Sequence, residues 1–135
     1  MNIESLNNQP EVKNTFNIEL LENEKIVFAS TFPSSVFMKK GQPLSGTKNE
    51  IILTNKRLIL CAREGHFSFD LKDDIQSCVE VKINLIFRKG YYYLVTLNAP
   101  VEYKDLVGRK YSTDAIRLEF NNTDRAKFIE LIGIS

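Results

Sequence analysis

The chain has 135 residues, of which 43% are hydrophobic and 26% are charged, and its formal net charge is +1. These values suit one globular domain, and the lack of a basic excess argues against nucleic acid as a partner, because nucleic-acid binding needs charge that neutralises phosphates. No run approaches the ~18 consecutive apolar residues of a membrane-spanning helix, and no signal peptide is evident at the start. We therefore expect a cytoplasmic protein. If it associates with a membrane, we expect it to do so only as a peripheral protein.

The first part of the chain predicts an arm and then a first strand. Residues 1–15 are polar and rich in asparagine, which indicates a flexible or short helical N-terminal arm ahead of a domain at 16–135. An apolar run predicts a strand at 26–29. Turn-forming residues over 31–46 predict a long connection that can include a short strand at 35–38.

The middle of the chain predicts two further strands and a turn. Apolar runs at 51–53 and 58–60 flank a polar corner at 54–57, a pattern typical of two antiparallel strands joined by a tight turn. Apolar and polar residues then alternate over 67–71, which predicts another strand with one apolar face. A polar turn is expected at 72–74.

A long hairpin and a last strand are expected next. The first hairpin strand is predicted at 78–87, the turn at Arg88-Lys89-Gly90, because glycine supplies a positive φ, and the partner strand at 91–97. Residues 98–114 are polar and predict a second long connection. The alternation at 116–120 predicts the last strand.

The chain ends with the pattern of an amphipathic helix at 123–133. Thr123 is a good N-cap residue, and Asp124 suits the positive end of the helix. An apolar stripe on this helix can cover a sheet, and it consists of Phe128, Ile129, Leu131 and Ile132. The whole pattern predicts a mainly β fold, namely a partly open antiparallel barrel of about seven strands capped by this helix.

The order of elements resembles that of the GRAM and bacterial pleckstrin-homology-like (PH-like) domains, whose second and third strands carry a pattern written G-x-L-x-x-T-N-x-R-L. The residues that carry the resemblance are Gly46, Ile52, Thr54, Asn55, Arg57 and Leu58. Related domains also place a glutamate before the first strand, as Glu24 is here, and close with a helix that bears an aromatic residue, as Phe128 does. The resemblance covers about residues 16–133. It implies a PH-like barrel, a structural role for Arg57, and loops at the open end that contact phosphoinositide or other anionic headgroups.

Residues suited to catalysis or metal binding are few. His66 is the only histidine, and Cys61 and Cys78 are the only cysteines, whereas a catalytic triad or a zinc site needs more partners at set spacings. Cys61 and His66 can face one another across a hairpin, but a surface histidine beside a buried free thiol explains the pair more simply. We expect no enzymatic activity, no cofactor and no metal.

Basic residues occur in pairs at predicted turns and loops. The pairs are Lys39-Lys40, Lys56-Arg57, Arg88-Lys89 and Arg109-Lys110. Each basic residue near an anionic leaflet contributes about 1 kcal/mol of binding free energy. Aromatic residues flank the third pair. The expected lipid-contacting residues are Lys39, Lys40, Arg88 and Lys89. Ordinary turn charges that keep a β protein soluble are the alternative explanation.

The sequence thus predicts a non-enzymatic PH-like binding module that contacts anionic phospholipid or phosphoinositide through basic loops. One alternative is a protein-interaction or self-association domain that uses a strand edge or the terminal helix. A small carrier of an apolar ligand is disfavoured, because such barrels need eight or more strands and an open cavity.

Overall fold

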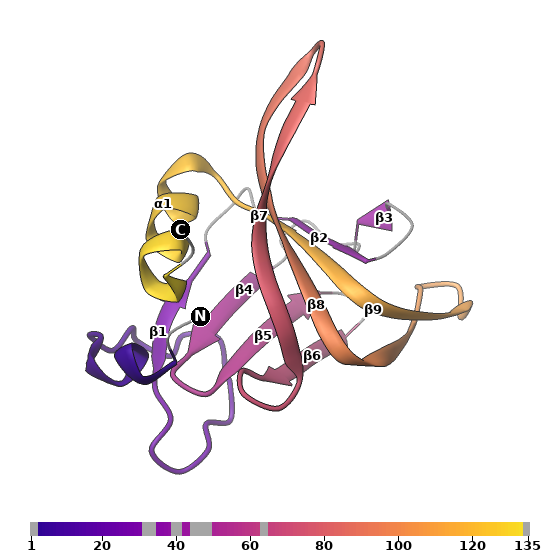
Figure 1. Cartoon of the computed structure of the whole chain (residues 1–135). Helices are drawn as coiled ribbons and strands as arrows, with labels where there is room; N and C mark the ends of the chain where they lie inside the picture. Colours follow the sequence, from indigo (N-terminus) through magenta and orange to yellow (C-terminus); the bar gives the residue numbers. More distant parts are fainter. Residues whose placement is uncertain (1–2, 31–34, 39–41, 44–49, 63–64, 134–135) are drawn as a thin grey trace.

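The computed structural model describes residues 3–30, 35–38, 42–43, 50–62 and 65–133 (Figure 1). These residues form nine strands in two antiparallel sheets, with one α-helix near the C-terminal end. The predicted mainly β fold with a C-terminal helix is confirmed. Each described strand pair lies within one sheet, and no closed barrel is formed by the described residues. No helix in this part of the chain has the length and hydropathy to cross a bilayer.

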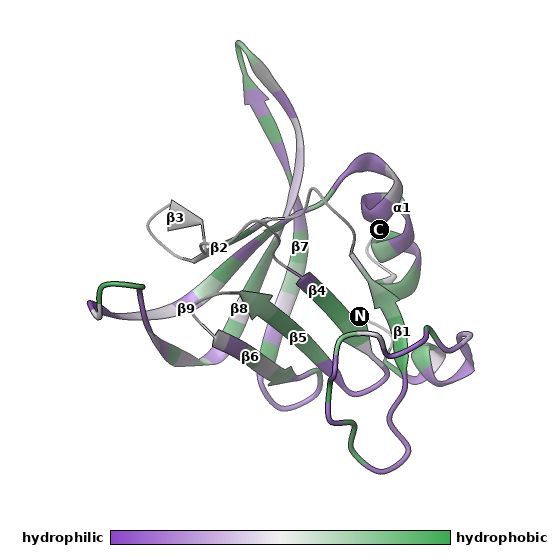
Figure 2. Cartoon of the chain, turned by 180° about the vertical axis from the view of Figure 1, so that it is seen from behind, coloured by the Kyte–Doolittle hydropathy of each residue, from purple (hydrophilic) through white to green (hydrophobic). Residues whose placement is uncertain are grey.

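The first sheet is the most hydrophobic part of the fold. Its strands follow the order β1 (Ile26–Ala29), β4 (Glu50–Thr54), β5 (Arg57–Ala62) and β6 (Gly65–Asp70). The corner Asn55-Lys56 joins β4 to β5, as the sequence predicted. Strands β1, β4 and β5 are almost uniformly hydrophobic in Figure 2, which fits burial on both faces.

The second sheet has its last strand in the middle. The order is β3 (Gln42–Pro43), β2 (Ser35–Met38), β9 (Lys110–Glu119), β8 (Arg88–Lys104) and β7 (Ile75–Leu85). Strand β9 pairs with β2 on one side, from Ser35↔Glu119 to Met38↔Ile116, and with β8 on the other. The short strand expected at 35–38 is confirmed.

The connection predicted at 98–114 is wrong, because strands occupy most of it. Strand β8 continues to Lys104 and β9 begins at Lys110, so only the residues between them form a loop. The polar composition misled the prediction. In a two-stranded ribbon, the polar side chains of one face can lie in solvent while the other face packs against the fold. Thr113 belongs to the packed face, because it is only 3% exposed.

Helix α1 (Asn122–Ile132) ends the described fold. Its N-cap is Asn121, whose Oδ1 accepts a hydrogen bond from the Asp124 N–H at 2.8 Å, so the prediction of Thr123 as N-cap is wrong. Asn and Thr are both good caps, and the tertiary packing of the helix decides which one is used. Gly133 ends the helix with a φ of 67°, and its N–H donates to the Ile129 oxygen at 2.9 Å.

The apolar face of α1 packs on both sheets through Phe128. The Phe128 ring lies 5.5 Å from the ring of Phe28 on β1, 5.1 Å from that of Tyr93 on β8, and 4.9 Å from that of Phe120. Its side chain is 2% exposed. Leu131 and Ile132 are buried beside it, so the predicted stripe does face the core.

The N-terminal segment packs onto the domain over its described residues. A short 3₁₀-helix, η1 (Glu4–Asn8), places Leu6 in the main core with no exposed area. Further along, the Val12 N–H donates to the Ile26 oxygen at 2.7 Å. The predicted short helix is therefore present, and it contributes to the same core as the strands.

Candidate functional site

The corner between β4 and β5 contains a buried carboxylate. The Glu24 side chain has no exposed area, and Arg57 donates to both of its oxygens, from Nη2 at 2.7 Å and from Nε at 2.8 Å. Thr54 Oγ1 donates at 2.7 Å and the Leu21 N–H at 2.8 Å. Burial by itself raises the pKa of Glu24, but the hydrogen bonds from Arg57, Leu21 and Thr54 together lower that pKa below its usual value.

The rest of this corner is also occupied by contacts within the fold. Asn55 Oδ1 accepts from the Lys25 N–H at 2.9 Å, and its Nδ2 donates to Asn7 Oδ1 at 2.9 Å. Lys56 Nζ donates to the backbone carbonyl oxygen of Glu22 at 2.6 Å. The basic pair Lys56-Arg57 therefore stabilises the domain, which is the structural role that the resemblance implied for Arg57.

The predicted lipid-contacting residues fall on two parts of the chain. Lys39 and Lys40 lie outside the described residues. Arg88 and Lys89 begin β8, and the Lys89 side chain is exposed. That all four lie at one end of the molecule remains a prediction.

The hairpin between β7 and β8 turns earlier than the sequence predicted. Its loop is Ile86-Phe87, and residues 88–90 already belong to β8, where they pair with residues 83–85. The prediction of a turn at Arg88-Lys89-Gly90 is thus wrong. Gly90 does have a positive φ, +156°, but it uses this conformation inside a strand opposite Ile83.

Residues 81–92 form a two-stranded ribbon that we call the projecting hairpin. Strand β8 pairs with β9 only from Tyr93 onward, so the preceding part of β8 and its β7 partners extend beyond the sheet, at the top of Figure 1. A two-stranded ribbon alone is marginally stable in water. This one is braced at its base, because the Arg125 guanidinium lies 4.0 Å from the Tyr91 ring centroid and Arg117 lies 4.0 Å from that of Tyr92.

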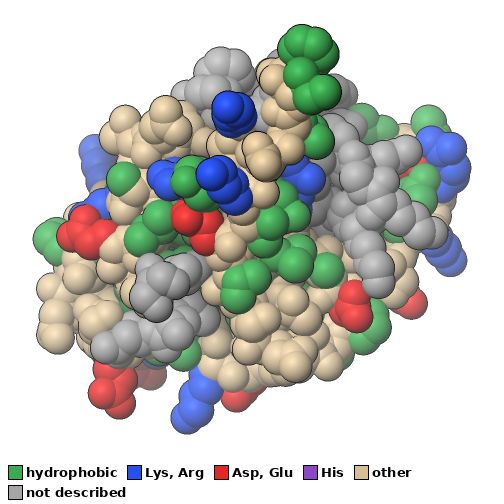
Figure 3. Space-filling view, turned by 45° about the horizontal axis from the view of Figure 1, so that its top comes forward, with side chains coloured by type: hydrophobic (Ala, Val, Ile, Leu, Met, Phe, Trp, Pro, Cys, Tyr) green, Lys and Arg blue, Asp and Glu red, His purple; other side chains and the backbone are tan. Residues whose placement is uncertain are grey.

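The end of the projecting hairpin combines exposed apolar and basic side chains. Leu85, Ile86 and Phe87 are 61%, 89% and 99% exposed. In Figure 3 hydrophobic side chains stand out at the end of this hairpin, with Lys or Arg side chains nearby. The hairpin sequence contains three basic residues, Lys82, Arg88 and Lys89, and no acidic residue. It therefore concentrates positive charge in a chain whose net charge is only +1.

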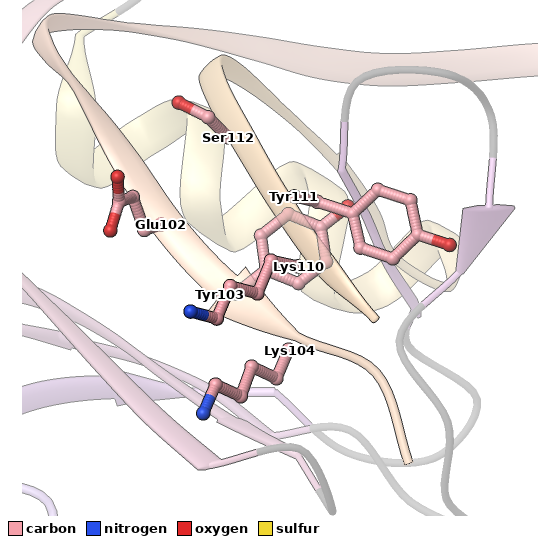
Figure 4. Close-up of a pocket in the computed structure, with 6 residues that line it drawn as sticks. All are labelled: Glu102, Tyr103, Lys104, Lys110, Tyr111 and Ser112. Carbon is pink, nitrogen blue, oxygen red and sulfur yellow. The ribbon is translucent and has the colours of Figure 1, made fainter. Parts of the chain in front are cut away.

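An open pocket of about 540 Å³ lies at the opposite end of β8 (Figure 4). It is lined by Glu102, Tyr103, Lys104, Lys110, Tyr111 and Ser112. Lys104 and Lys110 pair in register, and the two tyrosine rings stack at 5.3 Å. Glu102 offsets part of the positive charge. Arg109, beside the pocket, donates from Nε to Asp105 Oδ2 at 2.7 Å, so this end presents a mixed charge.

The core leaves little room for an apolar ligand among the described residues. The cavity under α1, bounded by Leu53, Val95 and Phe128 among others, has a volume of about 10 Å³. One water needs at least ~10–15 Å³, and small-molecule pockets span ~300–1,000 Å³. This cavity cannot hold a carried ligand.

The two cysteines are poor nucleophiles. Cys61 pairs with His66 in register between β5 and β6, as the sequence suggested, but Cys61 is buried whereas His66 is exposed. Burial raises the pKa of the Cys61 thiol to about 11 and that of the Cys78 thiol to about 12. Both thiols are thus protonated near neutral pH, and the thiolate is the reactive form. Among the described residues, no three His, Cys, Asp or Glu side chains gather as metal ligands do.

We expect both thiols to react slowly with a chromogenic disulfide reagent in the native protein and rapidly in denaturant, because unfolding removes the burial that raises their pKa. Absorbance of the released thiolate follows the reaction. His66→Ala is the control, and it should leave the native rate unchanged. A fast native reaction that slows in His66→Ala would instead reveal a histidine-activated thiol.

Comparisons with known proteins found no matching family model, no similar curated protein and no similar solved structure. The projecting hairpin remains as the candidate site, since the corner at Glu24 and Arg57 is used by the fold and the pocket at Lys104 and Lys110 has a mixed charge. Of the residues at this site, Arg88 and Lys89 were predicted from the sequence, whereas Lys82, Leu85 and Ile86 were not. The run Leu85-Ile86-Phe87 followed directly by two basic residues was the available signal.

Proposed function

We propose that the chain is a non-enzymatic PH-like or GRAM-like binding module that contacts anionic lipid headgroups at a membrane surface. The observation that supports this most is the projecting hairpin, which presents exposed lysines and lacks acidic residues. The resemblance around residues 46–58, together with two sheets closed by a terminal helix, supports a partly open PH-like barrel as the scaffold. A peripheral position at the membrane follows from this function.

The charge on the projecting hairpin is large enough to matter for binding. Each Lys or Arg near an anionic leaflet contributes about 1 kcal/mol of binding free energy, so the exposed Lys82 and Lys89 together supply about 2 kcal/mol. This attraction acts within a Debye length, which is about 10 Å at 0.1 M salt and about 3 Å at 1 M. The attraction is therefore expected to turn the end of the molecule that carries Lys82 and Lys89 toward the membrane.

Replacing Lys82 and Lys89 together with Ala is expected to weaken binding to phosphatidylserine-containing vesicles by about 30-fold, because two contributions of about 1 kcal/mol are lost. Co-sedimentation with vesicles of phosphatidylcholine, with and without phosphatidylserine or a phosphoinositide, measures this. Binding of the unmodified protein should fall as salt rises. The matched control is Lys104→Ala with Lys110→Ala, which removes the same charge from exposed positions at the other end of β8.

Three other results would decide between the alternatives. If only the control variant, with Lys104→Ala and Lys110→Ala, loses vesicle binding, the headgroup site would be the pocket of Figure 4. Weaker vesicle binding by a variant with Lys39→Ala and Lys40→Ala would support the contribution to lipid binding that was predicted for that pair. If the unmodified protein ignores anionic vesicles even at low salt, the membrane proposal fails and a protein-interaction module takes its place.

A further inference from the structure

The residues at the tip of the projecting hairpin suit neither the turn nor the core. Two-residue hairpin loops favour Asn and Gly, which supply positive φ angles, and neither Ile86 nor Phe87 has a positive φ. Phe87 is almost fully exposed, so it adds nothing to packing. Three consecutive exposed apolar residues raise the risk of aggregation, and such runs are uncommon unless they have a function.

The polar residues of the hairpin lie at a definite depth behind this tip. Lys82 and its register partner Tyr91 lie three residues back from Leu85, which is about 10 Å along an antiparallel strand. Interfacial elements bury their apolar part ~5–10 Å into the boundary between headgroups and acyl chains, and tyrosine is enriched at headgroup level. Lys89 lies between these two levels, opposite Asn84.

We infer that the tip formed by Leu85, Ile86 and Phe87 inserts into the interfacial layer of an anionic bilayer while Lys82 and Lys89 lie among the headgroups. This inference rests on the proposed membrane function and adds its mode of contact. A fluid bilayer can receive a narrow projecting ribbon without a preformed groove. The exclusively basic charge of the hairpin is complementary to anionic lipid, which favours a bilayer over an apolar protein surface.

The chain contains no tryptophan, so a single introduced one reports on its position. Phe87→Trp places the probe at the tip, and Val107→Trp is the matched control, because Val107 is 77% exposed in the loop at the other end of β8. With phosphatidylserine-containing vesicles, the emission of the Phe87→Trp variant is expected to shift to shorter wavelength and to be quenched by lipids brominated on their acyl chains. The emission of the Val107→Trp variant is expected to show neither change.

A second variant separates insertion from electrostatic attraction. Ile86→Ser with Phe87→Ser should weaken vesicle binding by about 10-fold or more for each side chain, and should abolish the binding that persists at high salt. Both positions are exposed, so the variant should fold normally. The salt-dependent attraction at low salt should survive in it.

Each outcome distinguishes the insertion from the proposed function. Salt-dependent vesicle binding without quenching of the Phe87→Trp variant would overturn insertion and leave the headgroup function standing. No vesicle binding at any salt concentration would overturn both. Equal quenching of the Phe87→Trp and Val107→Trp variants would also overturn insertion through this tip. So would an emission shift in Phe87→Trp that depends only on protein concentration, because self-association would then explain it.

Discussion

Phe128→Ala is expected to lower the free energy of unfolding by about 3–5 kcal/mol, because it leaves a cavity where one ring packs on three others, from both sheets and from the link between β9 and α1. Urea denaturation followed by circular dichroism measures the change. A domain of this size has a total stability of only about 5–15 kcal/mol, so the substitution removes a large share of it.

Phe87→Ala provides the matched control for this substitution. It deletes the same ring from a position that is 99% exposed, and a surface substitution of this kind usually changes stability by less than about 0.5 kcal/mol. Similar losses for Phe87→Ala and Phe128→Ala would show that the helix is not held on the sheets through Phe128.

Glu24→Gln should destabilise the fold by about 3–5 kcal/mol near neutral pH, since it removes the charge partner of Arg57 from a site where the Glu24 side chain is fully buried. The neutral amide also cannot accept all the hydrogen bonds that the carboxylate accepts from Arg57, Thr54 and the Leu21 N–H. Chemical denaturation of the variant and the unmodified protein in parallel measures the difference.

The effect of Glu24→Gln should depend on pH with a definite sign. The folded-state pKa of Glu24 is lowered, so the ionised carboxylate stabilises the folded protein. This stabilisation is fully present above the unfolded-state pKa of about 4.3, and it is lost as the pH falls through the folded-state pKa. The difference in stability between the two proteins should therefore be constant from pH 7 to about pH 5 and shrink in stronger acid. A difference that does not change down to about pH 2 would show that the charge of Glu24 does not stabilise the fold.

Adding Arg57→Met to Glu24→Gln tests whether the two residues act as a pair. The double variant should be less destabilised than the sum of the two single variants, because a lone buried charge costs more than the loss of both partners. Strict additivity would mean that the contacts at 2.7 and 2.8 Å contribute little.

The elements that the sequence predicted well are those defined by local pattern. Strands β4 and β5 have continuous apolar runs on both sides of a short polar corner, and α1 has a clear apolar stripe. Strand β9 was predicted too short, because its first half, Lys110 to Asp114, is polar and lacks an apolar alternation. Its extent is set by pairing with β8, which no local pattern reveals.

The candidate site was harder to predict than the fold. The basic character of Arg88-Lys89 and the aromatic residues beside that pair were visible, but Ile86 and Phe87 were assigned to the end of a strand, where exposed positions cannot be told from buried ones. Their exposure depends on where β9 stops pairing with β8, which is a property of the assembled sheet. The partners of Glu24 were equally hidden, since Arg57 lies far along the chain from it.

The position of β9 has a consequence for how the protein folds. The last strand in the sequence is the central strand of its sheet, and one of its neighbours, β2, comes from the first third of the chain. Pairing so distant in sequence makes folding slow, typically milliseconds to seconds for β-rich domains. Until β9 is synthesised, β2 and β8 have unpaired edges that can join other chains. Productive folding on the ribosome therefore has to wait for almost the whole domain to emerge.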